Sequence, residues 1–204
     1  MKEIYYMGGS PCSGKSTAAE ILAERYGLYY FKVDDYLEKY INDGAAAGME
    51  ICSRQSKMSP EEIWMREPSL QCREELQFYG EIFDFIMQDL EAVSDGRDII
   101  TEGAAYLPCL MKKRDISGNR YLAVVPAKDF QISHYAQREW VPYVLEGCSD
   151  VQKAFDNWME RDCLFAEEVK RQCIQNGYLS FVNDGQTEIE GVVQMISNHF
   201  GLMK

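Results

Sequence analysis

The chain has 204 residues, of which 46% are hydrophobic, so it is long enough to bury one substantial core. Its 21 basic and 33 acidic residues leave a net charge of −12, which excludes a general binding surface for nucleic acid or for an anionic membrane. Seven cysteines without a C-x-x-C pair predict neither a disulfide framework nor a zinc site. With no apolar leader or spanning stretch, this composition favours a cytoplasmic protein that does not enter a membrane.

Five short apolar runs predict buried β-strands, and amphipathic helical patterns separate them. The predicted strands are residues 4–7, 28–33, 98–101, 121–125 and 178–182. Strands that alternate with helices are typical of a parallel sheet covered on both faces. We therefore expect an α/β fold of three layers with about five parallel strands, formed by one domain over residues 1–204.

A glycine-rich loop follows the first predicted strand, and a helical pattern from Thr17 to Ala23 follows the loop. The loop fits the pattern G-x-x-x-x-G-K-[ST], in which backbone N–H groups hold phosphates and the lysine reaches the terminal phosphoryl groups. This predicts an ATP site with Mg²⁺ bound through Ser16, and the predicted cofactor-binding residues are Gly9, Ser10, Pro11, Cys12, Ser13, Gly14, Lys15, Ser16 and Thr17. The following helix N-terminus is expected to lower the pKa of Cys12 modestly.

Two aspartates end the second predicted strand, in Val33-Asp34-Asp35-Tyr36. Ligands of open α/β sheets lie beyond the carboxyl ends of the strands, so a carboxylate here is expected to face the site. Asp34 is the predicted base for an acceptor hydroxyl. Asp35 is interpreted as a helix cap, a Mg²⁺ partner or a substrate ligand.

Residues 1–36 resemble the P-loop kinases of nucleosides and small metabolites. The resemblance lies in the glycine-rich loop and in the strand that ends in Val-Asp-Asp-Tyr. This ending is similar to the Asp-Asp-Phe segment of uridine and nicotinamide riboside kinases and to the Val-Asp-Ser of chloramphenicol phosphotransferase, and shikimate-type kinases belong to the same group. The resemblance implies a P-loop NTPase sandwich, with Asp34 in the place of the catalytic base.

The third predicted strand ends in Thr101-Glu102-Gly103, where P-loop proteins usually carry an aspartate that holds Mg²⁺ through water. Glu102 is therefore predicted to bind Mg²⁺ or an acceptor hydroxyl, with a plain acidic strand end as the alternative. Gly103 is expected to leave room for a ligand close to the backbone. After the last strand, Asp184 lies in a turn that resembles the one beside adenine in these kinases, although a simple tight turn is the alternative.

Two irregular stretches, at about residues 41–68 and 139–149, are predicted to be insertions that bind substrate or close over it. Arg138 beside the second insertion is a predicted catalytic cation for the phosphates, while Arg66 and Arg161 are predicted substrate ligands. For Arg138 and Arg161 a surface ion pair is the alternative, and for Arg66 the alternative is a solvated charge on a helix. Capping-box spacings predict helix starts at Ser59, Ser149 and Thr187.

These observations predict an ATP-dependent phosphotransferase that moves the γ-phosphoryl group to a hydroxyl of a small molecule. A nucleoside or nucleoside monophosphate kinase is one alternative. A nucleotide-dependent switch with little or no kinase activity is an alternative of another class. The expected partners are ATP, Mg²⁺ and a small-molecule substrate.

Overall fold

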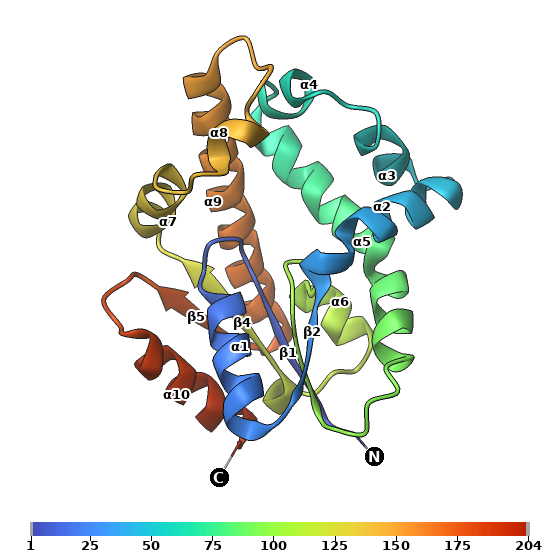
Figure 1. Cartoon of the computed structure of the whole chain (residues 1–204), viewed down its shortest axis with the longest axis vertical. Coiled ribbons are helices and arrows are strands. Elements are labelled where there is room, and N and C mark those ends of the chain that lie inside the picture. The colour runs from blue at the N-terminus through green and yellow to red at the C-terminus, as the bar shows by residue number, and fades with distance from the viewer. Residues whose placement is uncertain (1, 203–204) are drawn as a thin grey trace.

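The computed structural model describes residues 2–202, in which five strands form one parallel sheet (Figure 1). The strands are β1 (Ile4–Gly9), β2 (Tyr29–Lys32), β3 (Ile99–Glu102), β4 (Tyr121–Pro126) and β5 (Leu179–Asn183). Their order across the sheet is β2-β3-β1-β4-β5, and all four neighbouring pairs are parallel. The carboxyl ends of the strands therefore meet at one edge, with β1 in the centre. The five strands predicted from the sequence are confirmed.

Helices cover both faces of the sheet, because the side chains of each strand alternate between two apolar cores. On one face Met7 packs with residues of α1 and α10, and on the other Tyr6 packs with residues of α5 and α9. The covering helices are α1 (Lys15–Tyr26), α5 (Pro68–Glu91), α6 (Pro108–Lys113), α9 (Val151–Asn176) and α10 (Ile189–Phe200). The predicted three-layer α/β sandwich is therefore confirmed.

The two predicted insertions contain short helices beyond the carboxyl edge of the sheet (Figure 1). A 3₁₀ turn, Val33–Tyr36, leads from β2 into the first insertion, and another, Gly118–Arg120, precedes β4. The remaining helices are α2 (Leu37–Ala46), α3 (Glu50–Gln55), α4 (Pro60–Trp64), α7 (Lys128–Ala136) and α8 (Val141–Val144). In residues 2–202, no helix has the length and apolar character needed to cross a membrane.

One of the three predicted helix caps is correct and two are wrong. Ser59 forms the complete capping box of α4 with Glu62. Helix α9 is instead capped by Asp150, because the hydroxyl and the N–H of Ser149 both donate to Glu61 of α4. Helix α10 begins after Glu188, one residue later than the predicted cap at Thr187.

Candidate functional site

The glycine-rich loop joins β1 to α1 at the centre of the sheet edge, and its shape depends on two glycines. Gly9 has φ +124°, and a Cβ there would lie 1.8 Å from the carbonyl oxygen of Val124 on β4. Gly14 has φ +87° and begins α1, whose free N–H groups and positive end suit an anion. Asn183, at the end of β5, donates from Nδ2 to the carbonyl of Ser13 at 3.0 Å. The loop is therefore fixed by its neighbours on β4 and β5.

The lysine of the loop is buried, with 7% of its surface exposed. Its Nζ donates to the carbonyl of Ser10 at 2.9 Å and to Oγ of Ser13 at 3.5 Å. A buried ammonium needs such oxygen partners, because its desolvation is otherwise costly. Phosphate oxygens can replace these weak neutral partners, so the arrangement of Lys15 suits an anionic ligand.

Asp34 lies in the 3₁₀ turn directly after β2 and faces the loop across a cavity. The cavity has a volume of about 390 Å³. It is lined by residues 11–17 of the loop and helix α1, together with Lys32, Asp34, Tyr135, Arg138 and Trp140. The structure therefore brings the loop lysine, the predicted base and the predicted phosphate-binding arginine into one cavity.

Asp34 is exposed to solvent, but the protein atoms around it still partly desolvate its carboxyl group. This desolvation raises the pKa of Asp34, and the negative charge of Glu102 raises it further. The ammonium groups of Lys15 and Lys32 act in the opposite direction. Asp34 therefore has a higher proton affinity than an ordinary aspartate, as suits a general base.

Glu102 ends β3 beside the loop and is 1% exposed. Its Oε1 accepts hydrogen bonds from Oγ of Ser16 and from the hydroxyl of Tyr30, each at 3.0 Å. The structure thus joins the two residues that the sequence assigns to Mg²⁺. Their donor atoms are all oxygen, the kind that Mg²⁺ prefers, and one carboxylate with one hydroxyl suits an ion that also binds nucleotide phosphates. These residues fit the ion.

Gly103 does not leave the space that the sequence suggested. A Cβ at this position would lie 2.7 Å from Cβ of Val33, so the side chain of Val33 occupies that space. Gly103 therefore permits close packing between β3 and the 3₁₀ turn that carries Asp34, and the expectation of a ligand there is wrong.

Arg138, which follows α7, reaches the glycine-rich loop. Its Nη2 lies 3.7 Å from Sγ of Cys12, and its guanidinium group lies over the rings of Tyr135 and Trp140 at 5.5 and 5.6 Å. The expectation of a lowered pKa for Cys12 is wrong, because burial raises the pKa of this thiol more than Arg138 lowers it. Both aromatic residues are functional candidates that the sequence analysis missed.

Arg66 and Arg161 are held in ion pairs with carboxylates. Arg66 binds Glu74 on α5. Arg161 binds Glu75 on α5 at 2.9 Å and its neighbour Asp162 at 2.6 Å. The role of both arginines as substrate ligands stays a prediction, and this pairing argues against it.

Asp35 and Asp184 lie at the surface, and neither lines the cavity. Asp35 is 3.9 Å from the ammonium group of Lys32, and the 3₁₀ turn has no side-chain cap. Asp184 accepts from the backbone N–H of Gln186 at 2.9 Å and so stabilises its own turn. The residue of this turn that contacts the loop is the neighbouring Asn183, which the sequence analysis missed. An amide at the end of a strand, before Asp-Gly, was the available signal.

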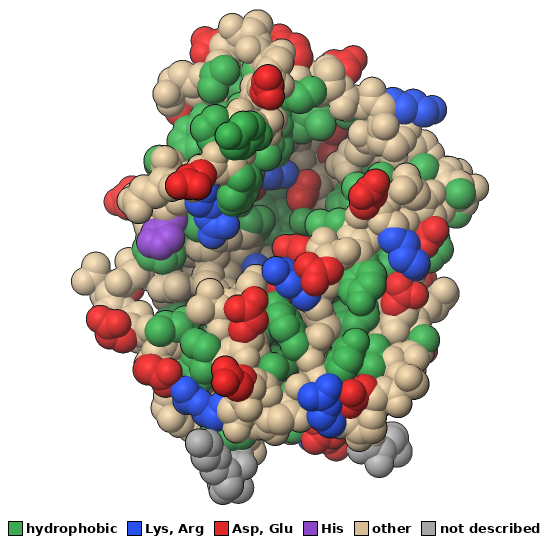
Figure 2. Space-filling view, viewed as in Figure 1, with side chains coloured by type: hydrophobic (Ala, Val, Ile, Leu, Met, Phe, Trp, Pro, Cys, Tyr) green, Lys and Arg blue, Asp and Glu red, His purple; other side chains and the backbone are tan. Residues whose placement is uncertain are grey.

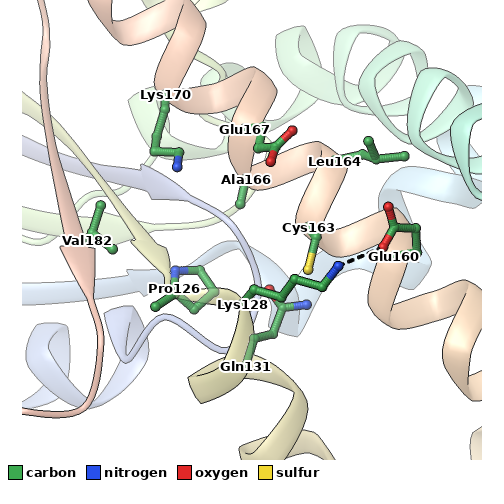
Figure 3. Close-up of a pocket in the computed structure, with 11 residues that line it drawn as sticks. Pro126, Lys128, Gln131, Glu160, Cys163, Leu164, Ala166, Glu167, Lys170 and Val182 are labelled. Atoms are coloured by element: carbon green, nitrogen blue, oxygen red, sulfur yellow. Dashed lines mark hydrogen bonds and ion pairs between the residues drawn. The ribbon is translucent and has the colours of Figure 1, made fainter.

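A second, smaller cavity of about 250 Å³ lies between α7, α9 and the ends of β4 and β5 (Figure 3). Its lining includes the ion pair between Lys128 and Glu160 at 3.1 Å. It also includes Gln131, which is fully buried. None of the predicted site residues lines this cavity.

No protein-family model and no curated protein matches this sequence. Solved structures do resemble it. A shikimate kinase from Bacteroides thetaiotaomicron is 16% identical with a TM-score of 0.54, and 98% of this chain and 99% of that chain are covered. A gluconokinase from Sinorhizobium meliloti 1021 is 11% identical with a TM-score of 0.50, and the covered shares are 98% and 91%. At these identities the likeness shows the fold alone, which this chain shares with these two structures.

Proposed function

We propose that this protein is an ATP-dependent kinase that moves the γ-phosphoryl group to a hydroxyl of a small molecule. The observation that carries the proposal is the cavity that Lys15, Asp34 and Arg138 line together. Phosphoryl transfer depends on holding the phosphates, orienting the attacking hydroxyl and stabilising charge, and these three side chains match the three tasks. Two of the solved structures with this fold are named as kinases, which supports the same reaction class.

In the proposed reaction, the backbone N–H groups of the loop and the start of α1 bind the phosphates. Lys15 exchanges the carbonyl of Ser10 for oxygens of the terminal phosphates. Arg138 approaches the phosphates from the second insertion, where its planar guanidinium can bind two oxygens at once. Asp34 orients the acceptor hydroxyl and accepts its proton as the bond to phosphorus forms.

We also infer that Ser16 and Glu102 hold Mg²⁺ together with the nucleotide. Bound there, the ion would neutralise charge on the phosphate oxygens. Tyr30 keeps the carboxylate of Glu102 turned toward Ser16 through its hydrogen bond. This second bond makes Tyr30 a positioning residue for the pair.

The two insertions are proposed to form the closing part of one domain. Glu61 on α4 accepts from both the N–H and the hydroxyl of Ser149, at 2.7 and 2.8 Å. The ring of Trp64 stacks on that of Trp158 with centroids 4.5 Å apart. The first insertion is thus tied to the second insertion and to α9, so both can exclude water, which would compete as acceptor.

The test is ATP turnover by the wild-type protein and by Asp34→Asn, with and without a panel of small alcohols. We expect one class of alcohol to stimulate turnover, and Asp34→Asn to lower that rate by about 10²- to 10⁴-fold, because it removes the base but keeps the shape. Asp35→Asn is the matched control and should have a much smaller effect, since Asp35 lies outside the cavity. Hydrolysis that needs no acceptor and is unchanged in Asp34→Asn would favour a nucleotide-dependent switch instead.

A further inference from the structure

The acceptor of the proposed kinase must lie beyond Asp34, in the hollow between the two insertions. Figure 2 shows this hollow between the α7–α8 side and the α2–α3 side of the molecule, with basic and acidic atoms together in its depth. Helix α9 forms part of this region, since Oγ of Ser10 in the loop donates to the carbonyl of Asp162 at 3.4 Å. Tyr135 and Trp140 line the cavity, and their rings lie 5.0 and 5.9 Å from the ring of Trp158 on α9. Helix α5 packs beside α9, with the ring of Tyr79 5.7 Å from that of Phe165. The charged groups of α5 and α9 therefore determine what this hollow can bind.

Arg161 is the cation of α9 in this region, and its charge is already compensated. It is 9% exposed and pairs with two carboxylates, Glu75 and Asp162. Its guanidinium group also lies 5.2 Å from the ring centre of Trp64. One cation between two anions leaves this cluster with an excess of negative charge when both carboxyl groups are ionised. An acidic acceptor group would have to displace a carboxylate from it.

The arginines of the first insertion are compensated in the same way. Arg54 of α3 binds Glu74 at 2.7 Å, and Arg66 binds the other oxygen of the same carboxylate. Glu74 is 8% exposed and belongs to the long helix α5, so both arginines are paired with a carboxylate that is itself buried. These two arginines converge, as an acceptor phosphate would require, but they converge on a carboxylate of the protein.

The remaining charges near Asp34 also disfavour an acidic acceptor. Lys32 lines the cavity, but it lies between Asp34, whose pKa it lowers, and Asp35, which is 3.9 Å away. Lys15 and Arg138 are on the nucleotide side, where the triphosphate needs them. Tyr135 and Trp140 also line the cavity, and the guanidinium group of Arg138 lies over both rings, so these two residues add no cation that could bind an acid.

We propose that the phosphoryl acceptor is an alcohol without a carboxylate or phosphate group, either neutral or cationic, because Glu74, Glu75 and Asp162 occupy the arginines that would bind an acid. This inference rests on the proposed kinase function and names its substrate class. It excludes hydroxy acids and nucleoside monophosphates, and it favours polyols, sugars, amino sugars and nucleosides.

The test uses alcohols matched in ring skeleton and different in charge: glucose, glucosamine and glucuronate, and uridine with uridine monophosphate. Phosphoryl transfer from Mg²⁺-ATP is measured for the wild-type protein and for Glu75→Gln. We expect kcat/KM of the wild-type protein to be at least about tenfold higher for the neutral or cationic member than for the acid. Glu75→Gln, which releases one partner of Arg161, should narrow that ratio by about tenfold, whereas Glu91→Gln at the exposed end of α5 should not.

If no compound of the panel is phosphorylated, binding is measured instead. The same compounds are titrated into wild-type and variant protein saturated with Mg²⁺ and a non-hydrolysable ATP analogue. Acids that bind Glu75→Gln but not the wild-type protein support the inference. Acids that bind both proteins equally, acids that bind neither, or an acid that is the better substrate of the wild-type protein overturn it.

Should Glu75→Gln not fold, Glu74→Gln takes its place, since it releases Arg54 and Arg66. Failure to bind the nucleotide would overturn the proposed function itself, and calorimetry with Mg²⁺-ATP alone identifies that case.

Discussion

Four charged neighbours and partial burial set the proton affinity of Asp34. Desolvation raises the pKa, the carboxylates of Glu102 and Asp35 raise it further, and the ammonium groups of Lys15 and Lys32 lower it. A base acts only when it is deprotonated, so activity should be lost as the pH falls through this raised pKa. Lys15 and Glu102 belong to the proposed nucleotide and metal sites, which leaves Lys32 and Asp35 as the neighbours that can be changed outside those sites. Of these two, only Lys32 lines the cavity.

At the scale of this single residue, we predict that Lys32→Met moves the acid limb of the pH profile of kcat/KM to higher pH. The substitution removes a positive charge that favours the ionised form of Asp34, so its pKa rises. The measurement is kcat/KM between acidic and neutral pH at fixed Mg²⁺. Lys39→Met is the control, because Lys39 binds Asp43 and Asp89 instead. An acid limb that stays in place or moves to lower pH would contradict the role of Asp34 as base.

Among the helices, α4 connects the two insertions through one carboxylate. Glu61 accepts two hydrogen bonds from Ser149, just before the start of α9. Hydrogen bonds to a charged group are stronger than those between neutral groups, but this pair is exposed to solvent. The contact therefore suits an element that closes and opens again.

We predict that Glu61→Ala loosens the second insertion, with faster backbone hydrogen exchange in residues 145–151 and a loss of about 1 kcal/mol in unfolding free energy at most. Glu146→Ala, at an exposed position of the same segment, is the matched control. Hydrogen-exchange mass spectrometry with and without nucleotide measures both variants. Equal exchange in Glu61→Ala and in the wild-type protein would show that the two insertions move independently of this contact.

The sequence predicts the strands better than it predicts the helices of the insertions. Strands buried on both faces need continuous apolar runs, and such runs are visible in the sequence. The start of α3 depends instead on Glu81 of α5, whose carboxylate accepts from the N–H groups of Ile51 and Cys52, each at 3.0 Å. A cap supplied by a residue some thirty positions away leaves no local pattern. The wrong cap at Ser149 has the same cause, because Glu61 competes for its hydroxyl.

The residues of the candidate site also differ in how well the sequence predicts them. The glycine-rich loop, Asp34 and Glu102 lie at the ends of strands, so topology alone brings them to one edge. Arg66 and Arg161 lie on or beside helices, and their availability depends on which carboxylates face them from α5. Such pairing across helices is set by packing, which no spacing in the sequence reveals.

At the scale of the whole molecule, the cluster of Arg161, Glu75 and Asp162 joins α5 to α9 beneath the hollow. Burial raises the pKa of Asp162 to about 6, against the opposing effect of Arg161. Between about pH 4, the ordinary range of an aspartate, and pH 6 the folded protein holds a proton that the unfolded chain has released. The carboxyl group of Asp162 therefore adds to the unfolding free energy at the low-pH end of this range. That contribution is lost as the pH rises through 6.

We predict that Asp162→Asn weakens the dependence of the unfolding free energy on pH. Relative to the wild-type protein, the variant should gain unfolding free energy as the pH rises from 5 to 7.5, by about 1.4 kcal/mol. Urea unfolding monitored at both pH values measures the difference, and Asp156→Asn on the exposed side of α9 is the control. A variant that keeps the full wild-type pH dependence would show that another group binds the proton.

The central place of β1 in the sheet has a consequence for synthesis on the ribosome. This strand emerges first among the five, yet its hydrogen-bonding neighbours, β3 and β4, begin only at Ile99 and Tyr121. Both edges of β1 therefore lack their native partners while roughly half of the polypeptide is translated, and such unpaired edges invite aggregation or chaperone capture. Nascent chains that end before β4 should consequently be unable to retain ATP, because the carbonyl of Val124 that accepts from Ser10 has yet to be made.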